Sequence, residues 1–196
     1  LPSYVYRDTT NDQLDPTEGT RLRFAPTPYV GWYTQQQHFI SNELSGSAYL
    51  SLDPASRYVL ATRAKIGALF GESREDIAAD KRFYAGGGSS IRGYPFQKVG
   101  QLDDHNNPIG GRSLLELSAE FRARVWGNFG VVPFIDGGTV YDSVVPNFSE
   151  TIRWGAGLGL RYYTIIGPAR LDVAFPINRR KDVDEPVQFY VNIGQA

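Results

Sequence analysis

The stretch Leu115-Glu116-Leu117-Ser118-Ala119-Glu120-Phe121-Arg122-Ala123-Arg124-Val125 alternates apolar and polar residues without a break. Successive side chains of a β-strand point to opposite faces, so this segment predicts a strand with one apolar and one largely charged face. The same period returns, in places more weakly, at residues 22–24, 40–50, 60–70, 131–141, 154–162, 171–177 and 187–193. Residues 3–8 add one partial strand. We therefore expect an all-β, antiparallel fold of about eight strands.

The composition supports strands and disfavours several functions. The 196 residues include 12 Tyr, 11 Phe, 3 Trp and 21 Gly, which is typical of short strands joined by turns. There is no cysteine, and His38 and His105 lack the neighbours that a metal or catalytic site needs. The net charge of -1 gives no overall field that would attract nucleic acid. We expect no enzymatic activity, no metal, no cofactor and no nucleic-acid partner.

The links between the expected strands favour a membrane barrel. They are short at residues 53–57, 127–128 and 165–168, and longer at 30–37, 72–110, 143–151 and 178–186. Short turns at one rim and long loops at the other are typical of an outer-membrane β-barrel. The connection before Arg21 is the exception, because it is longer than the other links on its side. Alternation alone also allows a soluble lipocalin-type barrel, in which the apolar face points inward.

The longest connection, residues 72–110, carries Gly86-Gly87-Gly88-Ser89-Ser90-Ile91-Arg92-Gly93-Tyr94 in its middle. Glycine permits backbone conformations closed to other residues, and Arg92 is a permanent cation between two apolar anchors. Loops of this length are usually functional. At ~3.3 Å per residue the loop exceeds two passes of ~25 Å through a barrel. We expect it to turn into the lumen, alone among the long loops.

This motif resembles that of the BamA/TamA superfamily of outer-membrane assembly proteins, the bacterial surface antigen barrels, whose long extracellular loop carries [Val/Ile]-Arg-Gly-[Phe/Tyr]. Residues 134–141 (Phe-Ile-Asp-Gly-Gly-Thr-Val-Tyr), 167–172 (Gly-Pro-Ala-Arg-Leu-Asp) and 187–194 are also similar to this family. The details of these motifs favour the TamA branch. The resemblance implies a sixteen-stranded barrel preceded by POTRA domains. Residues 1–196 then form the C-terminal half of that barrel, without a POTRA domain.

The resemblance further implies that the loop folds back into the lumen, where Arg92 meets Asp136. A bidentate guanidinium–carboxylate pair is strong where the local dielectric is low. From the residues alone, the preferred interpretation of Asp136 is a wet lumen residue that begins an Asp-Gly-Gly bend, and the resemblance favours the pair instead. The alternating Gly155, Gly157 and Gly159 leave room for something bulky, such as the loop. The candidate loop motif consists of Gly86, Gly87, Gly88, Ile91, Arg92, Gly93 and Tyr94.

The last strand is a second candidate site. In this family it forms a weak lateral seam, where client strands add by edge pairing. The candidate seam residues are Val187, Gln188, Phe189, Tyr190, Val191, Asn192, Ile193 and Gly194.

The resemblance implies a TamA-like factor of the bacterial outer membrane that inserts β-barrel or autotransporter clients. Its partners are then outer-membrane lipid, the clients and a TamB-like protein anchored in the inner membrane. A passive pore, a small structural barrel and a lipocalin-like binding barrel remain alternatives. Eight strands can also close on themselves, or two copies can form one barrel as a homodimer.

Overall fold

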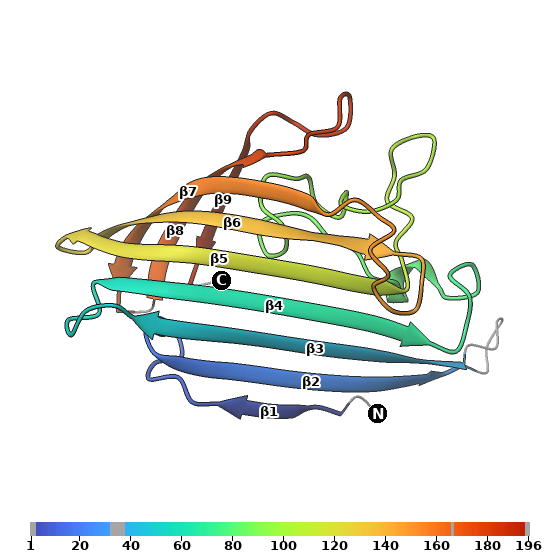
Figure 1. Ribbon diagram of the computed structural model, residues 1–196, viewed down its shortest axis with the longest axis horizontal. Coiled ribbons are helices and arrows are strands. Elements are labelled where there is room, and N and C mark those ends of the chain that lie inside the picture. Colours follow the sequence, from blue (N-terminus) through green and yellow to red (C-terminus); the bar gives the residue numbers. More distant parts are fainter. Residues whose placement is uncertain (1–2, 32–37, 166, 195–196) are drawn as a thin grey trace.

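The computed structural model describes residues 3–31, 38–165 and 167–194. Nine strands form one antiparallel sheet in chain order, and Figure 1 shows it as a curved wall with β1 at one edge and β9 at the other. The strands are β1 (Val5–Asp8), β2 (Gly19–Val30), β3 (His38–Ser51), β4 (Tyr58–Phe70), β5 (Ser113–Trp126), β6 (Phe129–Tyr141), β7 (Arg153–Thr164), β8 (Gly167–Pro176) and β9 (Gln188–Ile193). Among the described residues, the one helical element is the 3-10 turn Ala79–Lys81, and no helix is long and apolar enough to cross a membrane.

The expected all-β antiparallel fold is confirmed, with two differences at its ends. The partial segment at residues 3–8 forms β1, so the sheet has nine strands. Val187 and Gly194, expected within the last strand, lie outside β9. The ladder with β8 begins at the pair of Ala174 with Gln188, close to the end of β8 at Pro176. At its other end, the positive φ of Gly194, 91°, takes the backbone out of the extended conformation.

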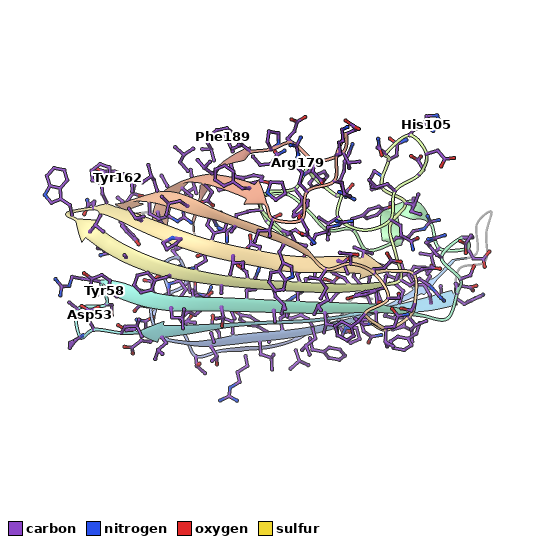
Figure 2. All side chains as sticks on the ribbon, turned by 45° about the horizontal axis from the view of Figure 1, so that its top comes forward. Asp53, Tyr58, His105, Tyr162, Arg179 and Phe189 are labelled. Carbon is purple, nitrogen blue, oxygen red and sulfur yellow. The ribbon has the colours of Figure 1, made fainter. Side chains whose placement is uncertain are left out.

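The connections follow the predicted separation into two rims. Figure 2 shows Asp53 and Tyr58 at the short-turn end of the molecule and His105 at the opposite end. Long connections at residues 71–112, 142–152 and 177–187 gather at that opposite end (Figure 1). The expected links at 30–37 and 165–168 include residues 32–37 and 166, which lie outside the described part of the chain.

The two faces of the sheet differ as the alternation predicts. Apolar side chains of the outward face are exposed, among them Leu117, Phe121, Leu158, Leu171, Phe189 and Val191. Charged side chains of the inward face are buried, among them Glu116, Glu120, Arg122 and Arg161. Strands β2 to β8 have 10 to 14 residues, enough to cross a bilayer at a tilt. An apolar exterior around a polar interior is the arrangement of a membrane barrel and the reverse of a lipocalin-type one.

The β4–β5 connection fills the concave side of the sheet and forms the main core. Its apolar side chains cluster with four residues of the sheet. The cluster consists of Ile77, Phe83, Ala85, Ile91, Tyr94 and Val99 with Phe39, Leu69, Leu114 and Val140. The loop also has structure of its own, because isolated bridges join Phe83 to Gly111 and Ala85 to Val99. Each large buried side chain contributes about 1.5–3 kcal/mol, so the loop is an integral part of the fold.

Two other connections form hydrogen bonds with the inward face or with the long loop, and the expectation that residues 72–110 alone among the long loops turn into the lumen stays a prediction. Between β1 and β2, Pro16 is buried and its carbonyl accepts a hydrogen bond from Arg122 Nη1 at 3.4 Å. Between β8 and β9, Arg180 Nη2 donates to the carbonyl of Lys98 at 2.6 Å.

Ser47 and Ala48 provide a matched test of the two faces. They are adjacent small residues on β3, and the alternation places Ser47 inward and Ala48 outward. In bilayers, a spin label on Ala48→Cys should collide readily with dissolved oxygen, because oxygen concentrates among acyl chains. A label on Ser47→Cys should respond more to a water-soluble nickel reagent. The reverse order of accessibilities would contradict the assignment of faces.

Candidate functional site

The turn of the loop depends on glycine in two different ways. Gly86 and Gly93 have φ values of 108° and 97°, which favour glycine over every other residue. Gly88 has no such conformation, but a Cβ there would lie 2.7 Å from the Tyr190 ring. The interpretation of Gly88 as a backbone-permissive position is therefore corrected, because it supplies space for a ring.

Arg92 and Asp136 meet in a bidentate ion pair at the tip of the loop. Arg92 Nε lies 2.7 Å from Asp136 Oδ2, and Arg92 Nη2 lies 2.9 Å from Asp136 Oδ1. The Arg92 backbone N–H also donates to Asp136 Oδ2, at 3.1 Å, and Ser118 Oγ donates to Oδ1 at 2.6 Å. The two side chains are only 2% and 1% exposed, so the pair is shielded from water. Asp136 is therefore fully occupied as an acceptor.

The Arg92 guanidinium has further partners on β5, β6 and β8. Its Nη1 lies 2.8 Å from Glu120 Oε1 and 3.2 Å from Asp172 Oδ2. Its Cζ lies 3.4 Å from the centroid of the Phe134 ring, in a cation–π contact. Burial by itself would lower the pKa of Arg92. The hydrogen bond to Asp136 and the three carboxylate charges outweigh burial and raise the pKa, so the side chain stays protonated.

Three more arginines complete this buried network. Arg122 Nε lies 3.0 Å from Glu120 Oε2, and Arg170 Nη2 lies 2.8 Å from Asp172 Oδ2. Arg161 forms a short ion pair with Asp172. Together with Arg92 and Asp136, four cations thus surround three carboxylates drawn from β5, β6 and β8. Each buried charge has an opposite charge beside it, which burial of ions requires.

The glycines of β7 make room for this arrangement. A Cβ at Gly155 would overlap the carbonyl oxygen of Arg92, and one at Gly157 would lie 2.5 Å from Phe134 Cζ. A Cβ at Gly159 would overlap the ion pair of Arg161 with Asp172. The space left by the three alternating glycines is therefore filled by the loop backbone at Gly155, by the Phe134 ring and β8 at Gly157, and by the charged network at Gly159.

The two apolar neighbours of Arg92 fix the loop tip on either side. Ile91 and Tyr94 are both fully buried. The Tyr94 hydroxyl lies 2.7 Å from Asn178 Oδ1 and 2.9 Å from the carbonyl oxygen of Trp154. Burial raises the pKa of Tyr94, which keeps its hydroxyl protonated. The tip is thus held by packing and hydrogen bonds as well as by charge.

Tyr190 links the loop to the last strand. Its hydroxyl accepts a hydrogen bond from the Gly93 N–H at 3.1 Å and donates one to the Tyr94 carbonyl at 3.0 Å. The neighbouring residues of β9, Phe189 and Val191, point outward and are exposed. The structure therefore brings one of the candidate seam residues into the loop site and leaves its neighbours on the outer face.

The sequence analysis missed Asp172 and Glu120 as partners of Arg92. The alternation had already placed both on the polar face of their strands. This signal marks a residue as inward but does not say which inward charges converge. Convergence depends on the curvature of the sheet and on the register of the strands.

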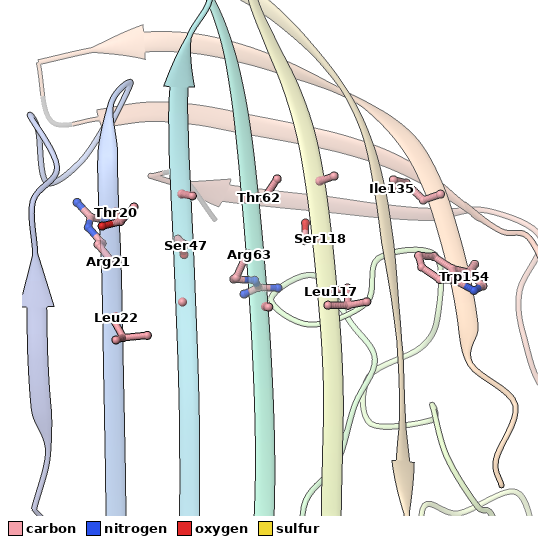
Figure 3. Close-up of a pocket in the computed structure, with 14 residues that line it drawn as sticks. Thr20, Arg21, Leu22, Ser47, Thr62, Arg63, Leu117, Ser118, Ile135 and Trp154 are labelled. Atoms are coloured by element: carbon pink, nitrogen blue, oxygen red, sulfur yellow. The ribbon is translucent and has the colours of Figure 1, made fainter. Parts of the chain in front are cut away.

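A shallow concavity of about 620 Å³ lies on the outer face. Its lining includes small residues such as Gly46, Ala64 and Ala119, and Figure 3 shows Leu22, Leu117, Ile135 and Trp154 among the others. None of the predicted site residues lies in it. The candidate site is the interior network, not this surface.

A curved antiparallel wall with an apolar exterior, a polar interior and a loop anchored inside defines an outer-membrane β-barrel protein. The chain belongs to the Omp85 superfamily, because residues 1–196 match the Omp85 superfamily domain. This membership confirms the expected superfamily and the expected location in the outer membrane.

Relatives and a solved structure agree with this assignment. The chain is 29% identical over 201 residues to the outer membrane protein assembly factor BamA of Nitratidesulfovibrio vulgaris, covering 96% of this chain and 24% of that protein. It is 26% identical over 196 residues to a SAM50-like protein of Schizosaccharomyces pombe, and this match covers 92% of this chain and 41% of that protein. The fold matches the crystal structure of BamA from Haemophilus ducreyi lacking POTRA domains 1–3, with a TM-score of 0.79 and 20% sequence identity. The match covers 96% of this chain and 41% of that one. The chain thus spans less than half the length of each.

We predict that Arg92 and Asp136 act as a pair in holding the loop. Removing one partner leaves the other charge buried and unpaired, a loss of about 3–5 kcal/mol. Arg92→Ala and Asp136→Ala should each expose residues 72–110 to protease in the folded protein. The double variant should be no more sensitive than either single one, and simple additivity would show that the residues act independently. Arg92→Lys should be almost as protease-sensitive as Arg92→Ala, because an ammonium cannot make the planar two-point contact with Asp136.

Gly155→Ala should displace the loop tip without removing any charge. The new methyl group would overlap the Arg92 carbonyl, and such overpacking costs about 1–3 kcal/mol or more. Gly46→Ala is a matched control, because the atoms nearest to its Cβ lie at an ordinary 3.6 Å. We expect faster proteolysis of the loop in the first variant and wild-type behaviour in the second. Equal behaviour would contradict the close packing of the tip on β7.

Proposed function

We propose that this chain is the barrel part of an outer-membrane protein assembly factor, which helps β-barrel clients to insert without using a nucleotide or performing covalent chemistry. The name of the Nitratidesulfovibrio relative describes such a factor. The proposed working part is the edge of β9. An exposed strand edge offers a row of backbone donors and acceptors to an incoming strand, so it can template pairing.

The observation that carries the proposal is the character of β9. It has six residues and pairs with β8 over six positions, whereas β7 and β8 pair over ten. Among the described residues it pairs with no strand other than β8. Its outward side chains, Phe189, Val191 and Ile193, are strongly exposed. A short edge strand with an apolar outer face suits the transient addition of a lipid-bound client strand.

The loop supports this function by keeping the wall in shape. The buried network joins the loop tip to β5, β6 and β8, so the curvature next to β9 is fixed from inside. The same filling opposes the alternative of a passive pore, because the loop occupies the space that solutes would cross. A lipocalin-like role is opposed by the apolar outer face.

We further propose the TamA-like branch, with autotransporters among the clients and a TamB-like protein as partner. The support for this branch is the Ile91-Arg92-Gly93-Tyr94 form of the motif, together with Gly-Pro-Ala-Arg-Leu-Asp at residues 167–172 and Gln-Phe-Tyr at residues 188–190. We also propose that residues 1–196 form the C-terminal half of a sixteen-stranded barrel. Partial coverage of both curated relatives supports this division over a homodimer of half-barrels or a closed eight-stranded barrel.

A photo-crosslinker tests the proposed edge. Benzoylphenylalanine at Phe189 replaces one exposed aromatic residue by another, and the same substitution at Phe121 gives a matched control on the interior strand β5. With the protein in vesicles and an unfolded barrel protein as client, we expect crosslinks to the client at position 189 and few or none at 121. Equal yields at both positions, or none at 189 while the client inserts, would contradict an active edge at β9.

A further inference from the structure

We infer that Tyr190 is a positioning residue that couples docking of the loop tip to the order of the edge strand β9. The inference deepens the proposed function: an effect of this coupling on client pairing rests on the proposed role of the β9 edge. Tyr190 is the inward residue near the middle of β9, and its partner in the ladder is Asp172 of β8. Asp172 in turn contacts Arg92. Two adjacent positions on neighbouring strands therefore hold the same loop tip.

The contacts of Tyr190 make it specific for the docked tip. Its hydroxyl bridges the backbone of two consecutive tip residues, by accepting from Gly93 N–H and donating to the Tyr94 carbonyl. Its ring lies over Gly88, where any side chain would collide with it. Both loop groups that bond to the Tyr190 hydroxyl belong to the backbone. The bridge therefore depends on the position of the tip and not on the identity of a side chain there.

The bridge gives β9 a second attachment besides its ladder. Backbone bonds to β8 hold one side of the strand, and the Tyr190 hydroxyl holds its inner face to the loop. When the tip leaves its seat, the hydroxyl loses both partners and β9 keeps only the short ladder. The position of the loop therefore sets how firmly the edge is ordered.

Hydrogen exchange of the β9 amides measures this coupling directly. Tyr190→Phe keeps the ring over Gly88 and removes both hydrogen bonds. The sample is the full-length protein reconstituted in phospholipid bilayers. In the Tyr190→Phe variant, the amides of residues 189–193 should exchange at least ~5-fold faster than in the parent protein, which corresponds to losing the stabilisation of about one hydrogen bond. Tyr84→Phe is the control, because that hydroxyl donates to the Ala79 carbonyl within the same loop, at 2.8 Å, and does not reach β9. Unchanged exchange in Tyr190→Phe, or equal acceleration in the control, would overturn the inference.

A double-variant comparison shows whether the coupling passes through Tyr190. Gly155→Ala, which displaces the tip without altering β9, should speed β9 exchange when Tyr190 is present and add little in the Tyr190→Phe background. Equal acceleration in both backgrounds would overturn the inference. Arg92→Ala offers a second way to displace the tip and should behave in the same manner.

Crosslinking of the client at position 189, measured in the same variants, separates the inference from the proposed function. Suppose that β9 amide exchange responds as described, but neither the parent protein nor any variant crosslinks the client. The coupling through Tyr190 is then supported, and the proposed role of the β9 edge is contradicted.

Discussion

The buried contact of Arg92 with Asp136 holds the inserted loop in the lumen and organises the surrounding residues. One carboxylate receives the guanidinium at two points and the backbone N–H of the same residue at a third. This geometry fixes both the side chain and the chain direction at the loop tip. Ile91 and Tyr94 are both buried in the same apolar cluster, and Gly155 of β7 has the loop backbone against it. A monodentate pair would fix the charge but leave the backbone free to rotate.

The network around this pair gives positional specificity more than stability. Burying ions is costly, and a well-packed apolar core of the same size is often at least as stable. Four arginines and three carboxylates, however, tolerate few arrangements, because any displacement separates a charge from its partner. The network therefore suits a lumen that must hold one loop in one place, while the apolar outer face only has to match lipid.

Most of the fold could be predicted from the sequence, and the site only in part. The alternation at Leu115 to Val125 was enough to separate the two faces, because the period of a strand is local. The meeting of Arg92 with Asp136 was expected only through the resemblance to a family, since no local pattern relates residues on a loop and a later strand. The roles of Asp172 and Tyr190 depend on the register between β8 and β9 and on the curvature of the sheet. The alternation of apolar and polar residues determines neither the register nor the curvature.

The order of the loop in the chain has a consequence for folding kinetics. The tip precedes its partners on β6, β8 and β9, and 44, 80 and 97 residues separate the bonded groups. Neighbouring strands can pair early through short turns, whereas closing such long segments is slow and entropically unfavourable until the partners are in place. The tip therefore becomes fully seated only after the final strand has joined the sheet. A chain truncated before β9 would therefore lack the two Tyr190 hydrogen bonds to the tip even if every earlier strand had formed.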